Sequence, residues 1–81
     1  MISCEQHDYV EIACMYNYLI KLSLNSGDEL EGIALDVKRN VNREECVKVK
    51  VDNTDVLVVL DSVSKMEVLV DNPHFKVVIF K

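Results

Sequence analysis

Hydrophobic and polar residues alternate along most of this chain, and the alternation is most regular between residues 19 and 40. Every second residue from Ile20 to Leu24 is apolar, which is the period of a strand with one face on a core and the other near water. The turn that follows contains Gly27, which can adopt a positive φ and lets the chain reverse. The pattern therefore predicts a hairpin in which Glu29–Val37 returns as the antiparallel partner.

The returning arm of this hairpin has an irregular apolar frame, because Leu30 and Ile33 are an odd number of residues apart with Gly32 between them. Glycine inside a strand marks a bulge or a sharp bend. A hairpin whose second strand bends strongly can take part in two sheets and can begin to close a barrel. We therefore expect a bend at Gly32.

Four further apolar runs, each bounded by turn residues, predict strands at Cys46–Val51, Val56–Leu60, Val63–Val70 and Phe75–Phe80. The run Val56–Leu60 is apolar without alternation, which is typical of a central strand covered on both faces, and an N-terminal helix is its candidate cover. Six short strands at regular spacing predict an antiparallel small β-barrel over residues 18–81. An open roll is the alternative.

A short N-terminal helix is predicted over residues 7–16. Asp8 and Glu11 have the spacing of a capping box, in which Asp8 is the N-cap and Glu11 reaches back to the free backbone amides. The acids would lie on one stripe of the helix, and an apolar stripe would contain Val10, Ala13 and Cys14. The fold class is then mainly β with one helix, in a single domain of residues 1–81.

The charge balance is acidic, with a net charge of -5 and a sequence pI of about 4.8. This balance argues against a surface that attracts nucleic acid over its whole extent, and it favours a basic partner. No Lys or Arg precedes Lys21, so Glu5, Asp8 and Glu11 form an unneutralised acidic patch. The alternative is that these acids only favour the positive end of the helix dipole.

A second charged feature is the polar segment Lys38–Glu45, which we expect to form a loop between two strands. It contains the cations Lys38, Arg39 and Arg43. A cationic loop on an acidic protein could contact phosphate or an acidic partner. The alternative is a charged loop that is simply solvated.

The residue types that carry catalysis or bind metals are sparse. Three cysteines cannot all pair within one chain, and their spacing favours a reducing cytoplasm. Cys4 and His7 have a C-x-x-H spacing, but the remaining possible ligands are scattered, so we expect no metal and no cofactor. No nucleophile motif accompanies either histidine, and no phosphate-binding glycine loop occurs, so we expect no enzyme.

Nothing in the sequence predicts a membrane segment. The longest uncharged apolar run, Val56–Leu60, is far too short to span a bilayer. The N-terminus has neither the basic start nor the apolar stretch of a signal peptide. We therefore expect a cytoplasmic protein without membrane contact.

The first hairpin resembles the first signature of Sm-like proteins, in which alternating apolar residues lead to Gly27, Gly32, Asp36 and Asn40. In that family the second signature carries an Arg-Gly pair that helps to hold RNA bases, and the region MEVLVDNPHFKVVIF has no such pair. The acidic balance and the scarcity of aromatics also weigh against RNA binding. An Sm-like RNA-binding protein acting in RNA regulation is therefore the alternative function.

The chain as a whole resembles the Rof family of Rho-binding antiterminators, over about residues 2–68. The resemblance is carried, in order, by Cys4, Asp8, Glu11-Ile12-Ala13-Cys14, Gly27, Asp36, the basic loop with its asparagine, Leu60-Asp61 and Val63. It implies a short helix on an Sm-like barrel and a protein that inhibits Rho-dependent transcription termination. Such a protein would bind the N-terminal RNA-binding domain of Rho and block its primary RNA site.

The resemblance also implies which residues contact Rho. The helix acids would face the basic groove of Rho, and the loop equivalents are either Lys38, Arg39 and Asn40 or, if the loop is one residue longer, Asn42 and Arg43. Carboxylates on a rigid helix can occupy the positive potential that otherwise attracts phosphates. The candidate partner-binding residues are Glu5, Asp8, Glu11, Asp36, Lys38, Arg39, Asn40, Asn42 and Arg43. We expect no direct nucleic-acid binding and a monomer when the protein is free.

Overall fold

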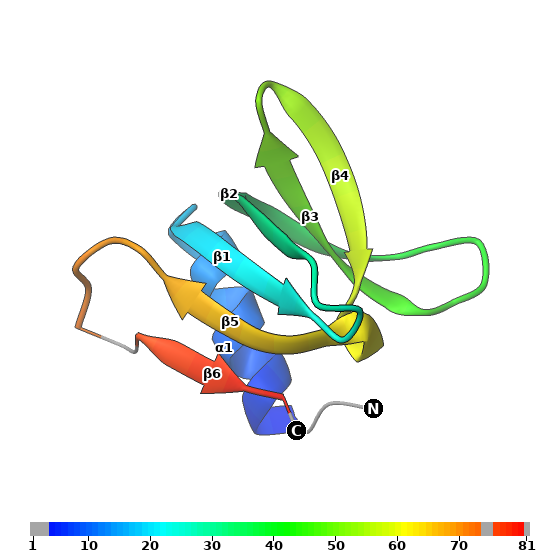
Figure 1. Cartoon of the computed structure of the whole chain (residues 1–81), viewed down its shortest axis with the longest axis horizontal. Coiled ribbons are helices and arrows are strands. Elements are labelled where there is room, and N and C mark those ends of the chain that lie inside the picture. The colour runs from blue at the N-terminus through cyan, green and yellow to red at the C-terminus, as the bar shows by residue number, and fades with distance from the viewer. Residues whose placement is uncertain (1–3, 74–75, 81) are drawn as a thin grey trace.

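The computed structural model describes residues 4–73 and 76–80 and shows one helix followed by six antiparallel strands (Figure 1). The mainly β fold with an N-terminal helix is therefore confirmed. A single turn of 3-10 helix, η1 (Leu60–Ser62), joins the fourth and fifth strands. The other elements are α1 (Cys4–Met15), β1 (Leu19–Leu24), β2 (Glu29–Arg39), β3 (Glu45–Val51), β4 (Thr54–Val59), β5 (Val63–Val68) and β6 (Val77–Ile79).

The six strands form one open sheet in the order β4-β3-β2-β1-β5-β6. Closing a barrel requires the two outermost strands to pair. Between residues 4–73 and 76–80, no ladder connects β4 to β6. The expected closed barrel over residues 18–81 is therefore wrong, and the open alternative describes the sheet. The predicted hairpins are present: β1 pairs with β2, and β3 pairs with β4.

The strand that the sequence places at the centre of the sheet lies at one edge, and the last strand lies at the other. The run Val56–Leu60 is predicted to be central, but within the described residues β4 pairs only with β3, and Leu57 is 49% exposed. The run is uniformly apolar because Val58 and Leu60 face the core while the strand passes directly into η1. At the other edge, β6 spans Val77–Ile79 of the predicted last strand and pairs with β5, and backbone hydrogen bonds from Val68 to Lys76 and from Phe80 to Ser64 extend the contact at both ends. Phe75 lies outside the described residues.

The helix begins earlier than predicted. Because α1 starts at Cys4, Asp8 lies in its second turn and cannot be the N-cap, so the predicted capping box with Glu11 is wrong. The predicted apolar stripe is confirmed, since Val10, Ala13 and Cys14 are all buried. The helix packs against β2 and β6 rather than covering β4. No helix in the described part of the chain is long and apolar enough to cross a membrane.

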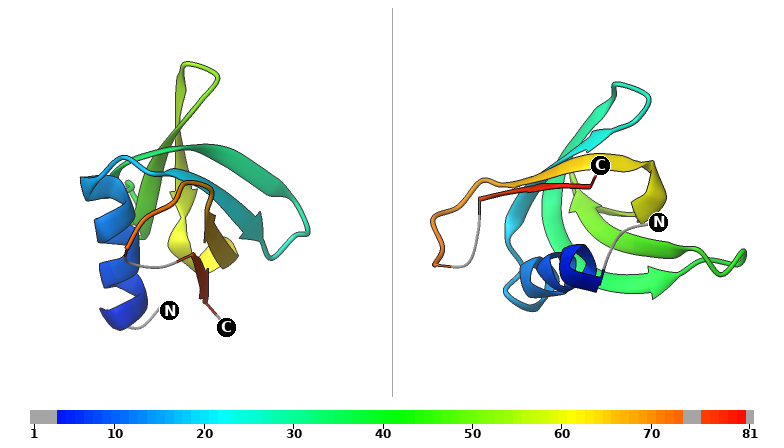
Figure 2. Two further views of the ribbon diagram at one scale, coloured as in Figure 1. Left: turned by 90° about the vertical axis from the view of Figure 1, so that its left-hand side faces the viewer. Right: turned by 90° about the horizontal axis from the view of Figure 1, so that it is seen from below.

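The curved sheet and the helix enclose a single core (Figure 2). Every strand, η1 and α1 contribute to it, and Ile20, Leu22 and Met66 are completely or almost completely buried there. The helix is also connected to the β6 edge, because Gln6 Nε2 donates a hydrogen bond of 2.7 Å to the carbonyl oxygen of Ile79. These contacts hold α1 in a fixed position against β2, where the candidate site lies.

The irregularity in the first hairpin lies after Gly32 rather than at it. Gly32 pairs with Ile20 in regular register, and the register with β3 shifts between Ala34 and Asp36, so Leu35 is the extra residue of a bulge. Gly32 is buried, and a Cβ atom there would meet the carbonyl oxygen of Lys50 and lie 2.7 Å from Val49 Cγ1. Glycine is therefore required at this position by packing against β3, not by a bend.

Candidate partner-binding surface

A shallow depression of about 280 Å³ lies between α1 and the second half of β2. Its lining brings together two of the predicted site residues that are distant in sequence, Glu11 of α1 and Asp36 of β2. Four further residues complete it, and none of the six is a cation: Cys14, Met15, Leu35 and Val37. The depression is thus an acidic site with apolar walls.

The bulge in β2 explains why Asp36 is available at this site. After the extra residue Leu35, Asp36 pairs with Lys48 and Val37 pairs with the fully buried Val47. Side chains alternate between the two faces of a strand, so without the bulge Asp36 would occupy the core-facing position opposite Val47. The extra residue therefore turns a carboxylate away from the core and leaves it exposed.

Both carboxylates of the depression are held by the fold through one oxygen. Asp36 Oδ1 accepts a hydrogen bond of 2.8 Å from the backbone N–H of Val37. Glu11 Oε1 lies 3.1 Å from Nδ1 of His7, one turn earlier on the same helix. Their second oxygens have no hydrogen-bond partner among the described residues. Each of the two carboxylates that line the depression therefore keeps one oxygen available to a donor.

The negative potential of this site affects the pKa of the Cys14 thiol. Its side chain lines the depression and is only 8% exposed. Burial, and then the nearby carboxylates of Asp36 and Glu11, raise the pKa of Cys14 from 9.0 to about 12, because each of these makes a thiolate less favourable. Cys14 is therefore a neutral thiol at physiological pH, and it does not have the low pKa of a nucleophilic cysteine.

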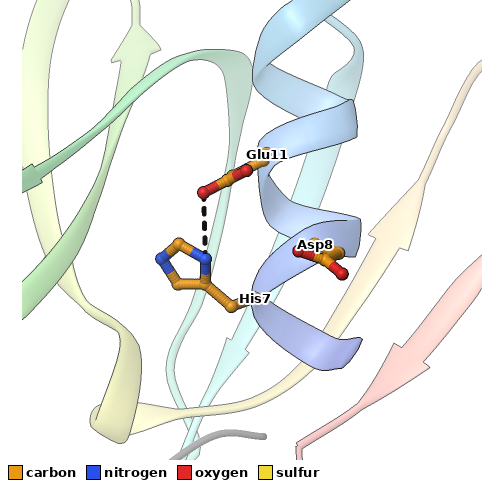
Figure 3. Close-up of side chains that lie close together, drawn as sticks. All are labelled: His7, Asp8 and Glu11. Carbon is orange, nitrogen blue, oxygen red and sulfur yellow. Dashed lines mark ion pairs between the residues drawn. The ribbon is translucent and has the colours of Figure 1, made fainter. Parts of the chain in front are cut away.

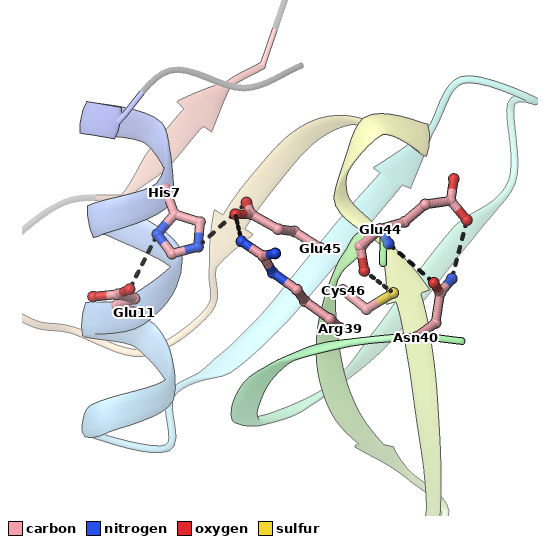
Figure 4. Close-up of polar contacts among 7 residues, drawn as sticks. All are labelled: His7, Glu11, Arg39, Asn40, Glu44, Glu45 and Cys46. Atoms are coloured by element: carbon pink, nitrogen blue, oxygen red, sulfur yellow. Dashed lines mark hydrogen bonds and ion pairs between the residues drawn. The ribbon is translucent and has the colours of Figure 1, made fainter. Parts of the chain in front are cut away.

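His7 connects the helix to β3 through a chain of polar side-chain contacts (Figure 4). Its Nδ1 is close to Glu11, and its Nε2 lies 3.4 Å from Oε2 of Glu45, the first residue of β3. Glu45 Oε1 is in turn 3.8 Å from the guanidinium of Arg39. The spacing of His7 and Glu11 could have predicted the first contact. The contact with Glu45 depends on the packing of α1, and no local pattern indicates it.

His7, Asp8 and Glu11 are the group within the described residues that could hold a metal ion, since their ligand atoms all lie within 4.8 Å of one another. Figure 3 shows His7 and Glu11 facing each other while Asp8 projects from the adjoining part of the helix. Both imidazole nitrogens already lie beside carboxylates. A metal ion bound through His7 would therefore displace one of these contacts. The expectation of no metal stays a prediction.

The basic segment is partly strand and partly loop. Lys38 and Arg39, which were expected in a loop, are the last two residues of β2, because their ladder with β3 continues to the pair Arg39–Glu45. Asn40 organises the turn that follows. Its Oδ1 accepts hydrogen bonds from the backbone N–H groups of Asn42 (2.9 Å) and Glu44 (3.0 Å), and its Nδ2 donates to Glu44 Oε1 (3.0 Å).

The remaining polar side chains of this segment are open to a partner. Lys38, Asn42 and Arg43 are exposed, and in the described chain neither Lys38 nor Arg43 forms an ion pair. Asn40 differs from them, because its side chain already uses both its oxygen and its nitrogen within the loop. The hydrogen bonds of Asn40 give it a structural role in the loop. Any contact of Asn40 with a partner would come in addition to this role.

The predicted site residues therefore form two neighbouring regions. An acidic region contains the exposed Asp8 together with Glu11 and Asp36 at the depression, and the side chain of Glu5 lies outside the described part of α1. A basic region lies at the end of β2 and in the following loop. The chain from Glu11 through His7 and Glu45 to Arg39 connects the two.

Comparisons with known proteins agree with this architecture. The family model described as "Modulator of Rho-dependent transcription termination (ROF)" matches residues 1–80. A solved structure, "YaeO bound to Magnesium from Vibrio cholerae O395", is similar with a TM-score of 0.87 and 38% sequence identity, covering 91% of this chain and 96% of that chain. No curated protein matches. The match of the family model to almost the whole chain shows that this protein belongs to the Rof family, the modulators of Rho-dependent transcription termination.

Proposed function

We propose that this protein inhibits Rho-dependent termination by binding the N-terminal RNA-binding domain of Rho and blocking its primary RNA site. The observation that carries the proposal is the family match over residues 1–80, because modulation of Rho-dependent termination implies Rho as the partner. The net charge of -5 supports competition with RNA, since an acidic protein and a nucleic acid are attracted to the same basic groove.

The acidic region supplies the charges for this competition. Asp8 and Glu11 project from a helix that is packed against the sheet, and Asp36 is held by the backbone of β2. Carboxylates fixed on rigid elements lose little side-chain entropy when they meet cations, so they compete better than flexible acids would. Opposite charge also accelerates the encounter of the two proteins and makes it sensitive to salt.

The basic region adds positive charges to an interaction surface that is otherwise negative. Lys38 and Arg43 are exposed cations, and in this proposal they contact carboxylates or polar groups at the margin of the RNA site. Charges of both signs fix one orientation of the partners, because a rotated complex would bring like charges together. In this proposal the protein acts as a cytoplasmic monomer without catalytic activity, cofactor or direct RNA contact.

A competition experiment tests the proposal. Rho hexamers are loaded with a fluorescently labelled C-rich RNA, and the anisotropy is followed as the protein is added. We expect the RNA to be displaced, with weaker displacement at higher salt. The protein is also titrated into the labelled RNA alone. Direct RNA binding with a steep salt dependence and no effect on Rho would contradict the proposal and favour the Sm-like RNA-binding alternative.

A further inference from the structure

We propose that the depression between α1 and β2 is a socket for one arginine side chain of the basic partner, bound between the carboxylates of Glu11 and Asp36. This inference deepens the proposed function and, where the partner is Rho, rests on it. It assigns a chemical group to one site: a guanidinium on a long apolar stem. Partner binding then has two parts: one specific contact between the arginine and the depression, and a general electrostatic attraction between the partner and the acidic surface.

The geometry of the carboxylates favours a guanidinium. Glu11 and Asp36 come from different elements, and each has one oxygen held by His7 or by the Val37 amide and a second oxygen open. A guanidinium presents several N–H donors in a rigid plane and can donate to two acceptors at once. An ammonium is a compact, strongly hydrated charge and gains less from two separated acceptors.

The walls of the depression fit the apolar stem of the same side chain. Met15, Leu35 and Val37 line it, and Met15 is 71% exposed although it is large and apolar. Arginine side chains bury their methylene groups along apolar surfaces while the charged head reaches polar partners. The depression has a volume of about 280 Å³, so it has room for the methylene groups of one long side chain.

A buried polar group at the depression also lacks a partner. The Cys14 side chain, 8% exposed, lines the site, and its Sγ has no hydrogen bond within the described residues. Its thiol can accept a weak hydrogen bond from a donor that enters. Burial, and then the carboxylates of Asp36 and Glu11, raise the pKa of Cys14, which agrees with both carboxylates lying near this thiol. A cation placed there would meet both carboxylates and the thiol.

The first test uses a small probe and does not require Rho. The ¹⁵N-labelled protein is titrated with N-acetyl-arginine amide at millimolar concentrations, and with the lysine and norvaline analogues. We expect amide shifts concentrated in the last turn of α1 and at residues 35–37, larger for arginine than for lysine and absent for norvaline. Asp36→Asn should reduce the shifts several-fold, whereas Glu31→Gln, an exposed carboxylate on the same strand, should not change them.

The outcomes distinguish this inference from the proposed function. Equal shifts with lysine, shifts scattered over all acidic residues, or larger shifts at the same amides with MgCl₂ would overturn the arginine socket. In Rho binding, Asp36→Asn should lower the affinity at least fivefold more than Glu31→Gln. If both variants bind Rho like the wild type, the socket is wrong and the function stands. If the wild type does not bind Rho, the function is wrong, while the probe titration still decides the socket.

Discussion

Nε2 of His7 lies 3.4 Å from Oε2 of Glu45, and this contact joins the N-terminal helix to the first residue of β3. The same imidazole meets Glu11 through its other nitrogen. The acidic helix and the basic end of β2 are therefore held in one relative orientation by a side chain between two carboxylates. Orientation of this kind matters for a protein that presents charges of both signs to one partner.

We expect His7→Ala to cost less than about 1 kcal/mol of unfolding free energy, because ion pairs between partly exposed side chains contribute little. The side chains of His7 and Glu45 are 24% and 42% exposed. Amide hydrogen exchange in the first turns of α1 should nevertheless increase. Urea unfolding and exchange followed by NMR measure the two effects. A loss of several kcal/mol, or unchanged exchange, would show that His7 does not act as a surface bridge.

Gly32→Val should destabilise the protein by roughly 1–3 kcal/mol through overpacking. A side chain at this position would meet the carbonyl oxygen of Lys50 and Val49 Cγ1, and strand β3 would have to move. The neighbouring exposed position provides the control, Glu31→Val, which adds the same β-branched side chain on the other face of β2. Urea titration monitored by circular dichroism compares them. Equal stability of both variants would contradict the packing requirement at Gly32.

Local patterns predicted the strands and the buried stripe of the helix well, because alternation and apolar spacing determine which face of an element is buried. Val10, Ala13 and Cys14 are examples. The pattern could not show whether the sheet closes into a barrel. An apolar run such as Val56–Leu60 looks the same in sequence at an edge as in the centre, because here the chain turns into the core at Leu60. It also could not give the helix start, where the acids at 8 and 11 imitate a cap.

The sequence could predict which charged residues belong to the candidate site, but not how they are arranged in space. The sequence indicated Glu11 and Asp36 separately, and only the packing of α1 on β2 places both at one depression. The irregularity of β2 was predicted at Gly32, because glycine is the usual local sign of an irregular strand, but the bulge lies at Leu35. Glu45 was missed because its contact with His7 is long-range and depends on the tertiary fold.

The Cys14 thiol predicts a pH dependence of stability. Its pKa is 9.0 in the reference state and about 12 in the folded protein. Between these values the unfolded chain loses a proton that the folded chain retains, so stability is fully present below about pH 9 and falls as the pH rises towards 12. The urea midpoint of the wild type should therefore fall more steeply over this range than that of Cys14→Ala. Parallel curves would contradict the raised pKa.

Asn40→Ala should lower stability by about 1–2 kcal/mol, because it removes two acceptor contacts and one donor contact that hold the loop. Asn42→Ala is the matched control, since Asn42 contributes only its backbone N–H to this network. Thermal unfolding and the NMR signals of residues 40–44 report the change. If Asn42→Ala proves as damaging as Asn40→Ala, the organising role of Asn40 is wrong.

One measurement tests most directly the central claim that the acidic helix surface competes for the RNA site of Rho. It is the affinity of Rho for the double variant Asp8→Asn with Glu11→Gln, determined over a range of salt concentrations. Asp8 does not cap the helix, and the contact of Glu11 with His7 is partly exposed and contributes little stability, so the substitutions remove charge with little effect on melting temperature. The control pair, Glu31→Gln with Asp52→Asn, removes the same formal charge from exposed positions outside the site. We predict that each substitution at the site weakens Rho binding by roughly 1–3 kcal/mol and that the salt dependence becomes shallower, while the control pair changes little. Unchanged Rho binding by the folded double variant, or an equal loss in the control pair, would contradict an acidic helix surface that competes for the RNA site.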